Sequence, residues 1–95
     1  MVKIIADLNR LKISEEVEQL GNEYVRYGAV PVKYRKDALH IAIAVLNHID
    51  ILVSWNYRHI VRRKTKEVVR MVNSKYGYPF IEIIAPPEIL GGEEL

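Results

Sequence analysis

The chain has no cysteine, and its 95 residues include only one tryptophan and one phenylalanine. Without thiols it can form neither disulfide bonds nor cysteine-ligated metal sites, and this composition favours an intracellular protein. No apolar run reaches the roughly 20 residues that cross a bilayer. Lys3 and Asp7 also interrupt the short apolar segment at the amino terminus, where a signal peptide would need a longer one. We therefore predict a cytoplasmic protein with no membrane partner.

Several enzyme motifs are missing as well. The sequence has no glycine-rich phosphate loop, no nucleophile elbow and no dinucleotide fingerprint, which argues against the enzyme classes that depend on them. His40, His48 and His59 contain no pair at the i, i+4 spacing that binds zinc on a helix. We expect His40 to be a partly buried histidine that can pair with Asp37, one turn earlier.

The formal net charge of +2 hides an uneven distribution of charge along the chain. Residues 33–76 contain ten Lys and Arg residues but only three acidic residues, whereas residues 77–95 contain four glutamates and no basic residue. The basic middle is a candidate surface for an anionic partner. The alternative is a solvated helix face that the acidic ends balance in space.

The apolar pattern predicts three major helices and two strands. Ser14 is a good N-cap for a first helix that ends at Gly28, and Gly21 within that helix indicates close packing. A second helix begins at or just before Asp37 and is apolar on every face, which predicts burial. The other expected elements are a third helix at Thr65–Tyr76, strands at Ile51–Ser54 and Phe80–Ile84, a helical stripe at Ile4–Leu11 and a frayed acidic tail from about Glu88.

The order of these elements predicts one α/β domain. A helix, a strand, a second helix and a second strand in succession imply a right-handed crossover between parallel strands. Sites in such folds lie outside the carboxyl ends of the strands. This rule places Asp37, at the start of the buried helix, and Asn56, just after the strand, at the same edge of the sheet.

Each polar residue at this edge can have a structural role instead of a functional one. Asp37 can cap its helix, or it can bind a hard cation such as Mg²⁺, which needs further oxygen ligands. Asn56 suits a turn as well as it suits a site. Trp55 is either a core or interface residue, or a platform on which a nucleic-acid base stacks.

The sequence resembles the carboxyl-terminal half of PIN domains over roughly residues 12–90. The resemblance is carried by DALHIAIA at 37–44, DILVSWNYRHIV at 50–61, and the pairs Val72-Asn73 and Gly77-Tyr78. PIN domains are metal-dependent ribonucleases, widespread in prokaryotes as the toxins of toxin–antitoxin modules. The resemblance implies a three-layer α/β/α fold with a parallel sheet, and an acidic cluster that binds Mg²⁺ or Mn²⁺ to activate water.

The resemblance assigns roles to only two residues of this chain. Asp37 matches the acidic residue at the start of the family's buried helix, which makes it the expected metal ligand and catalytic residue. Asn56 matches the position after the following strand, where the family has Asp or Asn, and it is the second expected catalytic residue. Met1–Ile13 is expected to contain no strand that ends in the family's first Asp, and Asp7 stands in a different context. The chain is therefore expected to be a truncated or degenerate PIN-like domain, 1–95, without the usual amino-terminal strand.

A truncated sheet has a consequence for assembly. Loss of a central strand exposes strand edges and an apolar sheet face, and both favour association. A second copy of the chain is the simplest replacement for the missing layer, so we predict at least a homodimer. The family resemblance also implies RNA and an antitoxin-like protein as partners.

Two functional hypotheses follow from the sequence. The first is a PIN-like, Mg- or Mn-dependent endoribonuclease that is impaired or inactive as this short chain, because one carboxylate binds the metal weakly. The second is a non-enzymatic module that binds nucleic acid or assembles with itself. In both hypotheses the expected nucleic-acid-binding residues are Arg58, Arg62, Arg63 and Lys66.

Overall fold

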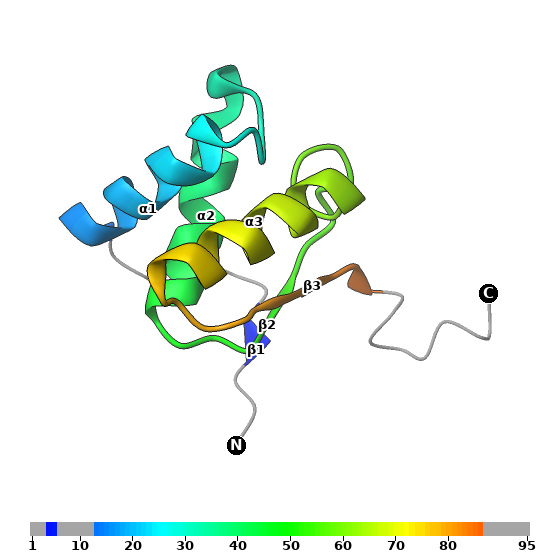
Figure 1. The fold of residues 1–95 in the computed structure, drawn as a ribbon. Helices are drawn as coiled ribbons and strands as arrows, with labels where there is room; N and C mark the ends of the chain where they lie inside the picture. The colour runs from blue at the N-terminus through cyan, green and yellow to red at the C-terminus, as the bar shows by residue number, and fades with distance from the viewer. Residues whose placement is uncertain (1–3, 6–12, 87–95) are drawn as a thin grey trace.

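The computed structural model describes residues 4–5 and 13–86. Within these ranges the chain forms three α-helices, one 3-10 turn and three short strands (Figure 1). In chain order they are β1 (Ile4–Ile5), α1 (Glu15–Arg26), η1 (Val32–Tyr34), α2 (Arg35–Leu46), β2 (Ile51–Val53), α3 (Arg63–Tyr76) and β3 (Glu82–Ile84). None of the described helices combines the length and the apolar composition that a membrane span requires.

The three strands form one parallel sheet in the order β1-β2-β3. Ile4 and Ile5 pair with Ile51 and Leu52, and β2 pairs in turn with β3, for example Leu52 with Ile83. The helix α3 connects β2 to β3. The parallel crossover predicted from the order of the elements is therefore confirmed, and the chain has the mixed helix and strand content of an α/β fold.

All three helices lie on one side of the sheet (Figure 1). Leu52 and Ile83, which are paired across the strands, belong to the same buried cluster as the helix residues. Residues on neighbouring positions of a strand point to opposite faces. Ile51 and its partner Glu82 therefore face the other way, and Glu82 is exposed. The described residues form two layers, so the third layer of the expected α/β/α arrangement is not among them.

The first helix follows its sequence pattern closely. The Ser14 side chain caps α1 by accepting a hydrogen bond from the backbone N–H of Val17 at 3.2 Å. Val17, Leu20 and Tyr24 form the buried stripe. Gly21 is also buried, and a Cβ built on it would lie 2.7 Å from Cδ2 of Leu39. The close packing indicated by this glycine is thus confirmed, and it sets the distance between α1 and α2.

The second helix is the buried centre of the domain, as predicted. Seven residues of α2, from Ala38 to Val45, are buried. The helix begins at Arg35, and its N-cap residue Tyr34 makes no side-chain capping bond. Asp37 lies within the first turn and not at the N-cap, so the prediction that it caps the helix is wrong.

The third helix packs through Val69, Val72 and Asn73, and it stops where Gly77 adopts a left-handed conformation with φ 78°. The buried hydroxyl of Tyr24 donates a hydrogen bond to Oδ1 of Asn73, which joins α1 to α3. Burial of this hydroxyl raises the pKa of Tyr24, which keeps it protonated as a donor. Tyr76, at the end of α3, is exposed and its hydroxyl donates to Glu23.

Two predicted segments differ from the structure. Ile4 and Ile5 form a strand, so the helical stripe predicted from Ile4 is wrong at these two residues. Backbone pairing with β2 overrides the helical spacing there. The predicted strand at Phe80–Ile84 begins only at Glu82. Asp7 and the predicted tail from Glu88 lie outside the described residues.

Candidate functional site

The candidate site lies where the start of α2 meets the loop that follows β2. A carboxylate oxygen of Asp37 is 3.4 Å from Nδ1 of His59, and both side chains are mostly buried. Because α2 runs back toward the start of β2, its first turn lies at the carboxyl end of that strand. The sequence placed Asp37 at this edge but did not identify His59 as its partner, because the pairing depends on where the loop folds back.

Asn56 organises the loop through its side chain and its backbone. Its side-chain oxygen accepts a hydrogen bond from the backbone N–H of His59 at 2.9 Å. Its backbone carbonyl accepts from the N–H groups of Ile60 and Val61. Ser54 supports the same turn, because its hydroxyl oxygen accepts from the N–H of Asn56 at 3.0 Å. The side-chain oxygen of Asn56 is thus used in a structural turn, as one of its two predicted roles requires. The same turn sets the position of His59.

His59 is held on a second side by an aromatic ring. Its imidazole stacks on Tyr34, with ring centroids 4.0 Å apart and an angle of 25° between the planes. His59 is only 8% exposed. Stacking on Tyr34 and pairing with Asp37 together fix the orientation of the ring.

Thr65 and Arg62 form a second polar cluster, which the sequence did not reveal. The Thr65 hydroxyl lies 2.7 Å from the carbonyl oxygen of Ala29 and 2.8 Å from that of His59. The guanidinium of Arg62 donates to the Thr65 hydroxyl and to the Ala29 carbonyl. Arg62, expected to bind nucleic acid, is therefore half-buried, and part of its hydrogen-bonding capacity is used to hold the loop.

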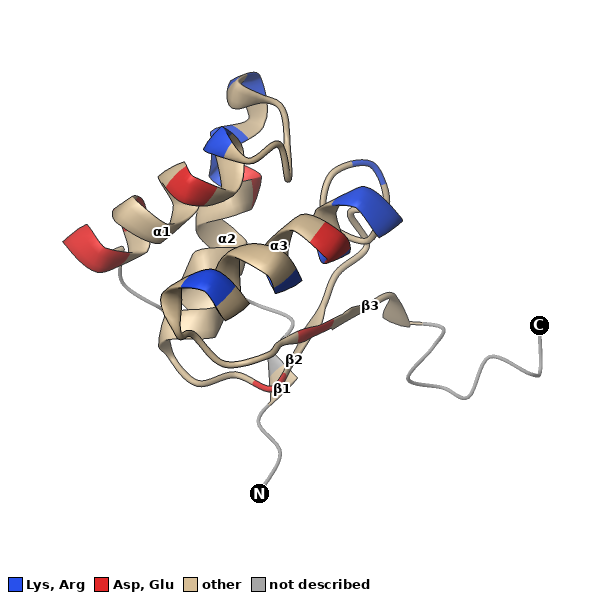
Figure 2. Ribbon diagram, viewed as in Figure 1, with Lys and Arg blue, Asp and Glu red and all other residues tan. Residues whose placement is uncertain are grey.

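The other expected nucleic-acid-binding residues occupy different settings. Arg58 is exposed in the loop after β2, and no ion pair within residues 13–86 involves it. Arg63 is exposed at the start of α3 and lies 3.3 Å from Glu67. Lys66 is half-buried. Figure 2 shows Lys and Arg residues at the beginning of α3, on the loop before it and near the beginning of α2.

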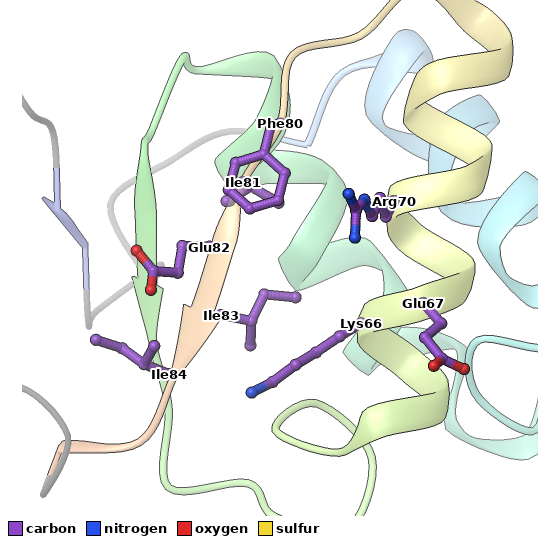
Figure 3. A pocket seen from close by; sticks show the side chains of 8 residues that line it. All are labelled: Lys66, Glu67, Arg70, Phe80, Ile81, Glu82, Ile83 and Ile84. Atoms are coloured by element: carbon purple, nitrogen blue, oxygen red, sulfur yellow. The ribbon is translucent and has the colours of Figure 1, made fainter.

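Lys66 also lines an open pocket of about 290 Å³ between α3 and β3. Figure 3 shows its side chain reaching toward the carboxyl end of β3, while Arg70 lies near Phe80 at the other end. Ile81 and Ile83 form the floor of the pocket on the helix-facing side of the sheet. The pocket thus combines an apolar floor with two cations and with the carboxylates of Glu67 and Glu82, so its lining favours no ligand of one charge and defines no chemistry.

His40 lies one turn beyond Asp37 and is partly buried, as expected. Burial lowers the pKa of His40, while the charge of Asp37 opposes this effect and that of Lys36 adds to it. The neutral imidazole is therefore favoured at this position. The short contact of Asp37 is with His59, and its interaction with His40 is the electrostatic one.

The described residues alone do not fit a strong Mg²⁺ or Mn²⁺ site. Within residues 4–5 and 13–86, no three His, Asp or Glu side chains come together as a group that could hold a metal ion. One oxygen of Asp37 faces His59, and Oδ1 of Asn56 already accepts an N–H group. Hard cations need several oxygen ligands. Any strong site would need carboxylates from residues outside the described ranges or from another chain.

Comparison with protein-family profiles, with curated proteins and with solved structures finds no match to this chain.

Proposed function

We propose that this chain is a PIN-like domain of the ribonuclease class that binds RNA at the carboxyl end of its sheet and is impaired in metal-dependent cleavage. The observation that carries the proposal is the contact of Asp37 with the loop after β2, through His59 at 3.4 Å. It brings the two segments of the PIN resemblance to one edge of a parallel sheet, where α/β folds bind their ligands.

The charge around this edge supports an RNA partner. Residues 33–66 contain eight Lys and Arg residues and two acidic residues. Of these two, Asp37 is paired with His59, and Asp50 precedes β2 and so lies toward the opposite end of the strand. Exposed cations at the carboxyl end are suited to phosphate contacts, which supply most of the affinity in sequence-independent binding.

The expected impairment of metal-dependent cleavage follows from the side chains that surround Asp37. A single carboxylate, already facing an imidazole, should hold Mg²⁺ or Mn²⁺ weakly. Cleavage by the family's metal-assisted route would therefore need carboxylates beyond those described. What the described residues can do is bind the RNA backbone and orient His59 beside it.

RNA cleavage measured with and without Mn²⁺ tests the proposal. We expect binding of a short single-stranded RNA in EDTA and little or no cleavage after Mn²⁺ is added. Asp37→Asn is the matched variant, because the amide keeps the size of the side chain and removes its charge. Strong Mn²⁺-dependent cleavage that the variant abolishes would contradict the impairment. Asp7→Asn in the same assay tests a carboxylate outside the described residues.

A non-enzymatic RNA-binding module is the second candidate, and the exposed Arg58 in the loop after β2, which forms no ion pair within residues 13–86, favours it. In this case Asp37→Asn leaves RNA affinity almost unchanged and no cleavage occurs at any Mn²⁺ concentration. RNA affinity should fall steeply as salt rises. If the combined variant Arg58→Ala, Arg63→Ala and Lys66→Ala binds as wild type does, RNA binding at this surface is wrong in both candidates.

A further inference from the structure

We propose that Trp55 and Tyr57 form a stacking site for an unpaired base of single-stranded RNA, directly beside the Asp37–His59 pair. This inference rests on the proposed function and specifies its substrate class. Both aromatic residues belong to the loop after β2, between Ser54 and His59, and neither is used by the contacts that hold Asp37, His59 and Asn56 together.

The two rings are exposed to an unusual degree for their size. Trp55 is 69% exposed and Tyr57 is 51% exposed. Large aromatic side chains usually bury most of their surface in the core or at an interface. The ring centroids are 6.5 Å apart and the planes are inclined by 57°, so the rings touch at an angle and do not cover one another's faces. Ring surface thus remains available for a planar ligand.

The loop that carries the rings is held in one conformation. The N–H of Tyr57 donates to the carbonyl oxygen of Trp55 at 2.9 Å, and the N–H of Asn56 donates to the Ser54 hydroxyl at 3.0 Å. The side chain of Asn56 then fixes His59. A prearranged loop loses little conformational entropy when a ligand binds. These contacts therefore favour a ligand-binding role over that of a mobile, solvated loop.

The charge beside the rings favours a nucleic acid over a protein partner. Arg58 follows Tyr57 directly and is exposed. The stacking of Tyr34 on His59 brings η1 against the same loop, so Lys33 lies nearby, with its ammonium group 5.8 Å from the centre of the Tyr34 ring. Cations beside exposed aromatic rings form the usual combination of single-strand binders, in which bases stack and phosphates pair with Lys or Arg.

Stacking also predicts which form of RNA binds. In a duplex the bases are already stacked on one another, and proteins reach mainly the backbone and groove edges. An unpaired base can leave its neighbours and lie on a tryptophan or tyrosine ring. We therefore expect the site to select single-stranded RNA over a duplex of the same sequence.

Tryptophan emission measures the stacking of a base on Trp55 directly, because Trp55 is the only tryptophan of the chain. A short single-stranded oligoadenylate titrated in EDTA should quench the emission of the wild-type protein in a saturable way. An abasic oligomer of the same length and the duplex should quench it much less. Equal quenching by all three would overturn the stacking site, because backbone contacts alone would then explain the signal.

Variants separate stacking from general affinity. Trp55→Ala should weaken binding of labelled single-stranded RNA about tenfold, and Trp55→Phe should retain most of the affinity. Phe80→Ala is the matched control, since Phe80 is 67% exposed but lies beside the α3–β3 pocket. Circular dichroism establishes that each variant is folded. Unchanged binding by both Trp55→Ala and Tyr57→Ala would contradict the inference.

The same experiments distinguish failure of the inference from failure of the proposed function. If labelled RNA binds in a salt-dependent manner and Trp55 neither quenches nor matters, the stacking site is wrong while RNA binding stands. If wild-type protein binds no RNA even at low salt, the RNA-binding part of the proposed function fails, and the stacking site fails with it.

Discussion

Single residues fix the loop after β2, and Thr65 does so through its side-chain hydroxyl. Its hydroxyl lies within hydrogen-bonding distance of two carbonyl oxygens, those of Ala29 and His59, and it accepts from the guanidinium of Arg62. A hydroxyl has one hydrogen, so it donates to one of the two carbonyls at a time. Through this contact the first turn of α3 is tied to the backbone of the residue that pairs with Asp37.

Thr65→Val should lower the free energy of unfolding by about 1–3 kcal/mol, because it leaves buried polar partners without their hydrogen bonds. Valine keeps the shape of the side chain, so the loss reports the hydroxyl. Thr65→Ser is the control, because it keeps the hydroxyl and should cost less. Urea denaturation of the three proteins measures the difference, and equal midpoints for Thr65→Val and wild type would contradict this account of the cluster.

At the scale of elements, the contact between α1 and α2 depends on Gly21. The nearest atoms to a Cβ at this position all belong to Leu39, and the closest, Cδ2, would be 2.7 Å away. Glycine usually weakens a helix interior by about 1 kcal/mol relative to alanine. Here the missing side chain lets α1 and α2 approach closely. The stabilisation from this packing exceeds the cost of placing glycine inside a helix.

Gly21→Ala should therefore destabilise the domain by about 1 kcal/mol. Overpacking costs about 1–3 kcal/mol, and the better helix propensity of alanine offsets part of it. Leu39→Val removes the clashing atom, so the double variant should lose less than the sum of the two single losses, as measured by urea denaturation. Gly77→Ala is a control for backbone strain alone. Gly77 has φ 78°, and a Cβ built on it would have no neighbour within 4 Å. A rise in stability for Gly21→Ala would contradict the packing argument.

At the scale of the whole molecule, one face of the sheet lacks a layer among the described residues. Ile4 is 57% exposed, its strand partner Ile51 is half-buried, and Ile84 is half-buried as well. By strand alternation these three side chains point away from the face that packs on the helices. Exposed apolar area of this kind favours association.

We predict that the chain forms at least a dimer through this face. Light scattering should give a mass above that of one chain, and Ile4→Glu should shift it toward the monomer, because a charge on the buried face of an interface is costly. Phe80→Ala, which alters a different exposed apolar residue, should leave the mass unchanged. A wild-type protein that stays monomeric across a wide concentration range would exclude the dimer.

Sequence reasoning succeeded where the pattern is local. Ser14, the apolar α2 and Gly77 set helix boundaries through interactions within a few residues, and the structure has them within two residues of the predicted positions. It failed at Ile4 and Ile5, which have helical spacing but form a strand, because pairing with distant Ile51 and Leu52 decides their conformation.

In the candidate site, too, the sequence predicted the local features but not the contacts between distant residues. From the sequence alone came the α/β class, the edge of the sheet that holds Asp37 and Asn56, and the basic middle of the chain, because order of elements and composition are properties of the chain itself. Only the tertiary structure decided that Asp37 pairs with His59, that Arg62 is tied to Thr65, and that Trp55 and Tyr57 remain exposed. The Asp37–His59 contact joins the first turn of α2 to the loop after β2, and no spacing along the sequence encodes the distance between these two side chains.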